Sequence, residues 1–139
     1  MIVLDTNVVS EAIRPAPDAG VVRWLNAQTA ETLYLASVTI AELRFGIGAL
    51  PPGARKDRLT RAVDGLEELF TGRILSFDQR AAHRYAEMTV RARAAGRPLP
   101  AADGYLAATA ASHEFAVATR NTRDFADTGV DLINPWQDA

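Results

Sequence analysis

The N-terminal stretch Ile2-Val3-Leu4-Asp5-Thr6-Asn7 is a short apolar run that stops at an acidic residue. Its first three residues are typical of a buried strand, because a strand covered on both faces is apolar throughout. Asp5, Thr6 and Asn7 end this strand, since their side chains favour turns and helix N-caps. The stretch therefore predicts a buried strand whose carboxyl end presents a carboxylate.

Apolar runs continue to alternate with helical patterns along the rest of the chain. Strands are predicted at residues 2–4, 33–36, 74–77, 117–119 and 132–133, and helices at 18–28, 38–50, 55–70, 78–95 and 101–114. This alternation requires crossover connections, which give a parallel sheet with helices on both faces. We therefore expect an α/β protein with three layers, α/β/α, around a central, mostly parallel sheet of four to five short strands.

The length of 139 residues predicts a single domain that covers residues 1–139. In an open parallel sheet, ligands bind at the carboxyl ends of the strands, where the strand order reverses. Asp5 follows the first predicted strand, and the polar run from Arg120 to Asp124 follows the fourth. We therefore expect the reversal, and a ligand site, between these two strands.

Composition excludes several classes of protein. The chain has 15 Lys+Arg and 17 Asp+Glu, a net charge of -2, so a nucleic-acid site would have to be local. It has no cysteine, which excludes a disulfide framework, a thiolate nucleophile and zinc held by cysteine. No GxxxxGK[ST] motif of a P-loop occurs. No signal peptide and no apolar run of about 20 residues is present, so we expect a cytoplasmic protein without membrane contact.

Three carboxylates stand next to or within apolar segments, where a purely structural role explains them only in part. Asp5 ends a strand, and a turn or N-cap role explains it as well as a functional one does. Glu42 shares one face of the helix 38–50 with Val38, Phe45 and Ala49. An ion pair of Glu42 with Arg44, or with another arginine at the edge of the apolar stripe, is the structural alternative.

Asp103 is the most informative of these acids. The predicted helix around it consists of Ala, Gly, Leu, Tyr, Thr and Ser, which indicates a central, buried helix. A carboxylate there is costly unless it is paired, capped or bound to a metal. Its place in the first turn offers an alternative, because the helix dipole stabilises an acid there by ~0.3–1 kcal/mol. Clustered carboxylates suit hard cations such as Mg²⁺ or Mn²⁺, which also serve phosphodiester hydrolysis.

Four segments in order resemble a PIN domain. They are Leu4-Asp5-Thr6-Asn7, Thr39-Ile40-Ala41-Glu42-Leu43, the run from Ala102 to Ala110, and the run from Ala118 to Phe125. Together they span nearly the whole chain. More narrowly, the chain resembles VapC-type toxins of type II toxin–antitoxin systems, in the FitB subgroup, and Asn134-Pro135-Trp136 near the C-terminus adds to this likeness.

The resemblance implies an endoribonuclease that depends on Mg²⁺, with Mn²⁺ as a substitute. Asp5, Glu42 and Asp103 would be the catalytic acids, with Asp5 and Asp103 as the principal metal ligands and Glu42 holding a metal or its water. The family's fourth acidic position falls on Asn121, and an aspartate follows at Asp124. A neutral amide does not balance a second dication, so we expect one strong metal site and a weaker second one.

Further residues are expected to assist. The hydroxyl groups of Thr6 and Thr119 would orient water or phosphate, although both also suit ordinary strand-end turns. Asp124 would be auxiliary, or else a cap or a partner for a neighbouring arginine. Arg120 and Arg123 flank the expected metal site and would bind RNA.

The family likeness also implies partners. These are a cognate small antitoxin of the VapB or FitA type, operator DNA reached only through that antitoxin, and a homodimer or a higher hetero-oligomer. Composition itself shows none of this. Large apolar side chains beyond the obvious needs of the core hint at a contact surface, but core packing is the preferred interpretation for Trp24, Leu25, Phe45 and Tyr105.

Two other functions remain open. A phosphatase-like hydrolase with Asp5 as nucleophile is disfavoured because the second acid expected two residues later is replaced by Asn7. A catalytically weak PIN-fold protein that acts in RNA binding, or in operator regulation with an antitoxin, is kept open by Asn121.

Overall fold

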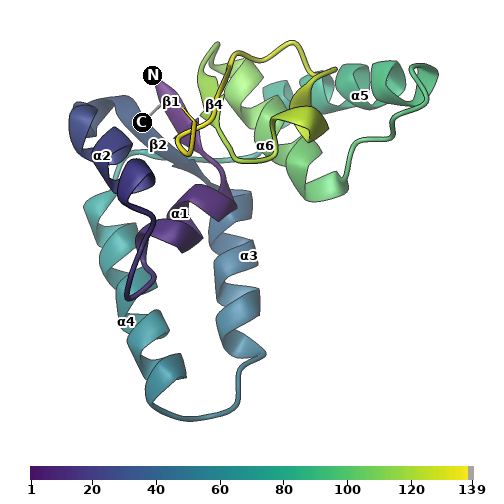
Figure 1. The fold of residues 1–139 in the computed structure, drawn as a ribbon. Coiled ribbons are helices and arrows are strands. Elements are labelled where there is room, and N and C mark those ends of the chain that lie inside the picture. Colours follow the sequence, from purple (N-terminus) through teal and green to yellow (C-terminus); the bar gives the residue numbers. More distant parts are fainter. Residues whose placement is uncertain (138–139) are drawn as a thin grey trace.

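The computed structural model describes residues 1–137, so the last two residues of the expected 1–139 domain lie outside the described part. Figure 1 shows the fold, coloured along the chain. Besides helices and strands, the described residues form two 3₁₀ turns, η1 and η2. In chain order, the elements are β1 (Ile2–Leu4), α1 (Thr6–Ala12), α2 (Ala19–Ala27), η1 (Ala30–Thr32), β2 (Leu33–Ala36), α3 (Ser37–Gly48), α4 (Ala54–Leu69), β3 (Ile74–Leu75), α5 (Gln79–Ala94), α6 (Ala101–Ser112), β4 (Ala116–Ala118), η2 (Thr122–Phe125) and β5 (Leu132–Ile133).

The sheet within residues 1–137 has five strands, all parallel, in the order β3-β2-β1-β4-β5. The chain adds β2 and β3 on one side of β1 and then crosses to add β4 and β5 on the other. The strand order thus reverses between β1 and β4, as the sequence predicted. The register pairs Leu4 with Ala118, so that both strands end at the same level.

Helices cover both faces of the sheet, which confirms the three-layer α/β/α architecture. On one face, Leu4 packs in a cluster with residues of α1 to α4 such as Val8, Val21 and Val63. On the other face, Val3 packs with Met88 of α5 and with the buried stretch of α6. Neighbouring residues of β1 therefore serve opposite layers, which explains why this strand is apolar throughout. Figure 1 shows α3 and α4 projecting together from the sheet.

The main departure from the predicted elements is α1. Asp5 caps this helix, and Val8 and Val9 anchor it in the core. At 7 residues it is shorter than the window over which helical periodicity can be recognised, so the sequence indicated only its cap. The third strand is also shorter than predicted and ends at Leu75, while Thr119 lies just past the end of β4.

The expectation of core packing holds for two of the four large apolar side chains and fails for the other two. Trp24 is buried and Leu25 packs against the core, as expected. Phe45, in contrast, is 79% exposed, and Tyr105 is also exposed, so their assignment to core packing was wrong. Within residues 1–137, no helix combines the length and the apolar character that crossing a bilayer requires.

Candidate active site

Asp5 lies at the carboxyl end of β1 and is almost fully buried, with 6% exposure. Its Oδ1 accepts a hydrogen bond from the Thr6 backbone N–H at 2.7 Å, and its Oδ2 accepts one from the Thr119 hydroxyl at 2.8 Å. Its own N–H donates to the Ala118 carbonyl at 2.9 Å. The expected N-cap role is therefore real, and the same side chain also joins the ends of β1 and β4.

Glu42 reaches this site through Thr6. The Thr6 hydroxyl donates to Glu42 Oε1 at 2.6 Å, and the Thr39 hydroxyl lies 3.3 Å from the Thr6 hydroxyl. The alternative ion pair between Glu42 and Arg44 is wrong, because Arg44 turns away to bind Asp64 and Glu67 on α4. Glu42 therefore belongs to the strand-end cluster.

Asp103 lies in the first turn of α6, as expected from the sequence. Burial raises the pKa of Asp103 to about 6, and the negative charges of Asp5, Asp124 and Glu42 add to this rise. The helix-dipole alternative is compatible with this position, but it would stabilise the charged form and lower the pKa. Desolvation and the neighbouring acids outweigh it.

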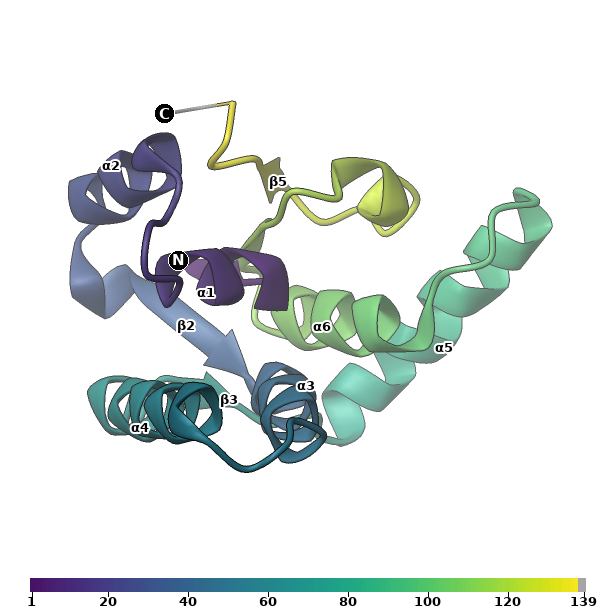
Figure 2. The same ribbon diagram turned by 60° about the horizontal axis from the view of Figure 1, so that its bottom comes forward.

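The pKa of Asp5 is raised as well. Burial is the main cause, and the charges of Glu42 and Asp124 contribute, while the hydrogen bonds from Thr119 and Thr6 oppose the rise. Asp5, Glu42, Asp103 and Asp124 therefore act on one another electrostatically, and we call these four residues the acidic centre. Asp5 directly precedes α1, Glu42 lies on α3 and Asp103 lies on α6. Figure 2 shows these three helices gathered around one end of the sheet.

The acidic centre fits a hard divalent cation by its chemistry. Its donors are carboxylate oxygens, and their mutual repulsion is the kind that a bound cation relieves. The carboxylates do not yet converge, since among residues 1–137 no three acidic or histidine side chains form a ready metal-holding group. Side-chain rotation toward a shared cation would be needed to complete the site.

Thr119 organises the β4 side of the site. Besides donating to Asp5, its hydroxyl accepts from the Asn121 backbone N–H at 3.0 Å and from the Asn7 side chain at 3.4 Å. The structure thus places Thr119 and the Asn121 backbone in direct contact around Asp5. Asp124 follows in η2 and acts on the centre through its charge.

The two arginines have different surroundings. The Arg120 guanidinium lies over the Trp136 ring, 5.0 Å from its centroid. The backbone N–H of Arg120 donates to Asn7 Oδ1 at 3.3 Å. Arg123 lines a cavity together with Asp124. Both are exposed close to the acidic centre, as expected for residues that meet a polyanion.

Sequence analysis missed three contributors: Thr39, Asn7 in its contact with Thr119, and Trp136. Thr39 stands one helical turn before Glu42 on α3, so helical spacing was the available signal. The other two contacts join segments more than 15 positions apart. No local pattern in the sequence indicates them.

A strand-end cluster of acids at the reversal of a parallel α/β sheet lies where such sheets bind ligands, and its carboxylates are donors of the kind that hold a divalent cation. The family model described as PIN domain matches residues 2–131. The chain therefore belongs to the PIN-domain family.

Relatives match over the full length. The chain is 47% identical to a VapC ribonuclease, Y4jK, of Sinorhizobium fredii, covering 100% of both chains. It is 46% identical to Toxin FitB of Neisseria gonorrhoeae, covering 99% of this chain and 100% of that one.

Solved structures agree with these relatives. The crystal structure of FitAcB from Neisseria gonorrhoeae has a TM-score of 0.93 at 45% identity and covers 99% of both chains. A structure of FitAB bound to a DNA fragment has the same TM-score and identity, with 99% of this chain and 96% of that chain covered. The PIN fold predicted from the sequence is thus confirmed.

Proposed function

We propose that this protein is a divalent-metal-dependent endoribonuclease and the toxin of a type II toxin–antitoxin module, with residues 1–139 acting as one PIN domain. One observation carries the proposal: at the strand-order reversal, Thr6 donates hydrogen bonds to both Asp5 and Glu42, and negative charges of neighbouring acids act on Asp5 and Asp103. The full-length similarity to a VapC ribonuclease and to Toxin FitB supports it.

Asp5 and Asp103 would hold the cation, which we propose to be Mg²⁺ with Mn²⁺ as a substitute. Glu42 would contribute its second oxygen, because Oε1 is already bound to Thr6. When bound, such an ion polarises the phosphoryl group and lowers the pKa of an attacking water.

The chain's own residues prepare this chemistry. Thr119 and the Thr6 backbone fix both oxygens of Asp5, so the carboxylate keeps one orientation and still has free lone pairs. The Thr6 hydroxyl fixes Glu42 in the same way. Asn121 supplies an amide where a fourth acid would add charge, so the second cation site is expected to be weak, with Asp124 as its auxiliary acid.

RNA would approach over the arginines. Arg120 is held over Trp136 instead of collapsing onto the acids, so its guanidinium stays available for a phosphate. Arg123 stands beside Asp124 on the neighbouring turn. We propose that both contact the RNA backbone near the cut.

We further propose that a small antitoxin of the VapB or FitA type binds this protein in the cytoplasm, and that operator DNA is reached only through it. The similar FitAB complex bound to DNA supports this assignment. A homodimer, or a higher hetero-oligomer with the antitoxin, is also proposed. The exposed rings of Phe45, Phe77 and Tyr105 offer apolar surface for such a contact.

The decisive experiment is cleavage of a mixed, structured RNA by antitoxin-free protein in Mg²⁺, Mn²⁺ or EDTA. The Asp5→Asn variant, purified in parallel, controls for a contaminating nuclease. We expect fragments that require the metal and disappear in the variant. No cleavage with either ion, from protein shown to be folded, would refute the proposal.

A catalytically weak PIN-fold protein is the second candidate, because Asn121 stands at the fourth acidic position and the described acids do not yet converge. Its role would be RNA binding or antitoxin-dependent operator regulation. Tight RNA binding without turnover would favour this candidate over the nuclease.

A further inference from the structure

A small cavity adjoins the acidic centre. It encloses about 180 Å³ between α5, the loop before α6 and the turn that contains η2. Arg123 and Asp124 form part of its wall. Pro100, also in the wall, is the N-cap residue of α6, and the first turn of this helix carries Asp103 of the acidic centre. A group seated in the cavity would therefore lie beside a phosphodiester held at the centre.

Buried apolar side chains form part of the lining of the cavity. Met88 and Ala92 of α5 are 2% and 3% exposed, and Leu99 stands between two prolines at the entrance to α6. The volume is below the roughly 300–1,000 Å³ of pockets that take whole small-molecule ligands. The space suits one flat ring system and excludes a base-paired helix.

The rim carries hydrogen-bonding groups of both kinds. Arg97 donates from Nε and Nη2 to the two oxygens of Asp127 at 2.8 and 2.7 Å. This pairing neutralises Asp127, and Arg123 and Asp124 add a second donor and acceptor. A phosphate would be repelled by Asp124, whereas a nucleobase edge is neutral and presents both donors and acceptors.

We propose that this cavity is a base subsite, which receives one unpaired nucleobase next to the phosphodiester that the acidic centre cleaves. The inference rests on the proposed ribonuclease function and deepens it. Because the base must leave its stack to enter, the substrate is single-stranded at the cut, as in a loop or a bulge.

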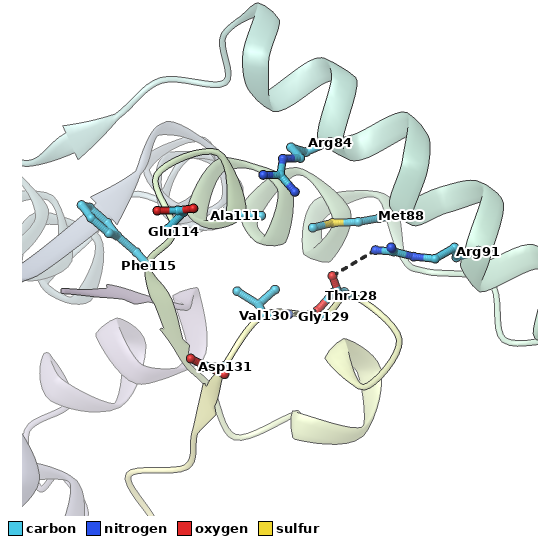
Figure 3. Close-up of a pocket in the computed structure, with 10 residues that line it drawn as sticks. All are labelled: Arg84, Met88, Arg91, Ala111, Glu114, Phe115, Thr128, Gly129, Val130 and Asp131. Carbon is cyan, nitrogen blue, oxygen red and sulfur yellow. Dashed lines mark hydrogen bonds between the residues drawn. The ribbon is translucent and has the colours of Figure 1, made fainter.

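A second cavity provides an internal control. It encloses about 390 Å³ on the other side of Met88 and Thr128, which line both cavities. Figure 3 shows this second cavity, with Arg91 donating to the Thr128 carbonyl at 3.3 Å. Its described lining includes Ala111 and contains none of the four acids. A larger side chain in this second cavity should therefore change neither RNA affinity nor the cut positions.

The experiment compares two matched substitutions. Ala92→Leu adds a branched side chain to the proposed subsite, and Ala111→Leu adds the same group to the control cavity. Binding of a fluorescent, mixed-sequence single-stranded RNA is measured by anisotropy in an Asp5→Asn background with Mg²⁺. Cut positions are mapped in the otherwise unchanged protein.

We expect Ala92→Leu to raise the Kd by about five- to hundredfold, the cost of one lost base contact, and to shift the cut positions. Ala111→Leu should change neither. Ala92 is buried, so thermal unfolding must confirm that the variant folds. The exposed Arg123→Ala provides a second test through the cut positions, which should shift as in Ala92→Leu, because a loss of affinity alone would also follow from a backbone contact. The RNA annealed to its complement should bind more weakly and be insensitive to Ala92→Leu.

The outcomes separate the two proposals. If the protein cleaves RNA but Ala92→Leu and Arg123→Ala leave both affinity and cut positions unchanged, the base subsite is refuted and the nuclease stands. Equal losses for single-stranded and duplex RNA would also refute base insertion. If the protein neither binds nor cleaves RNA, the proposed function fails and the subsite falls with it.

Discussion

The Thr6 hydroxyl donates to Glu42 Oε1 at 2.6 Å and so ties the first turn of α1 to α3 across 36 positions of sequence. The same residue donates its backbone N–H to Asp5. A single threonine therefore orients two carboxylates of the acidic centre. This arrangement resembles the outer-shell contacts that hold metal ligands in place, whose loss typically costs 10–100-fold in metal affinity or activity.

Thr6→Val should therefore weaken both metal binding and cleavage by about 10–100-fold, because valine keeps the shape but cannot donate to Glu42. Isothermal titration with Mn²⁺ and cleavage rates would measure the two effects. Thr6→Ser, which retains the hydroxyl, should recover most of both. Equal losses in the serine and valine variants would show that any change at this position disturbs the site, and would contradict the role assigned to the hydrogen bond.

Asp103 should make the stability of the metal-free protein depend on pH. Its pKa is about 6 in the folded protein, against the usual 3.8 of an aspartate side chain, so between these values the folded chain holds a proton that the unfolded chain has lost. Stability then falls as pH rises through this window and stays low above it. In EDTA at pH 8, Asp103→Asn should melt at a higher temperature than the wild type, and near pH 4 the difference should vanish.

Asp127 supplies the control of opposite sign. Its partly exposed carboxylate has a lowered pKa because Arg97 donates hydrogen bonds to it. Asp127→Asn should therefore give no gain in melting temperature at pH 8. A gain as large as that of Asp103→Asn would indicate that general charge reduction, and not the acidic centre, causes the effect.

Asn121→Asp should strengthen binding of a second divalent cation. The substitution places a charged oxygen donor beside Thr119, where the backbone of residue 121 is already held at 3.0 Å. Calorimetry should show a higher affinity or an added binding event for Mg²⁺ or Mn²⁺. Unchanged affinity would contradict the role assigned to this position.

Gly104 is required by the packing of α6 against α5. A Cβ at this position would lie 2.8 Å from Tyr85 Cε2 and 3.3 Å from Leu99 Cδ2, and the Tyr85 ring is itself stacked on Tyr105. Gly104→Ala should therefore lower the free energy of unfolding by about 1–3 kcal/mol through overpacking, despite the better helix propensity of alanine.

Gly65 in α4 is the matched control for that substitution. Nothing lies within 4 Å of a Cβ built there, so Gly65→Ala should stabilise the protein by roughly 0.4–1 kcal/mol. Urea unfolding of both variants would measure the two changes. If the two substitutions had the same sign, Tyr85 would have to be free to move away.

Sequence periodicity predicted most of the fold because its strands and longer helices are buried in regular patterns. It also predicted the acids Asp5, Glu42 and Asp103, since a carboxylate within an apolar context needs an explanation. Sequence periodicity did not predict the contacts between segments that are far apart along the chain. The choice of Arg44 for Asp64 and Glu67 depends on how α3 and α4 pack, which adjacency along the chain does not reveal.

The hydrogen bond from Thr119 to Asp5 spans 114 positions, nearly the whole chain. During synthesis, β1 and its carboxylate leave the ribosome first, but β4 cannot pair with β1 until the residues around Thr119 have emerged. Asp103 and Asp124 also come from this late part of the chain. The order of translation therefore acts as a delay: a growing polypeptide lacks an assembled acidic centre until its final fifth has been made.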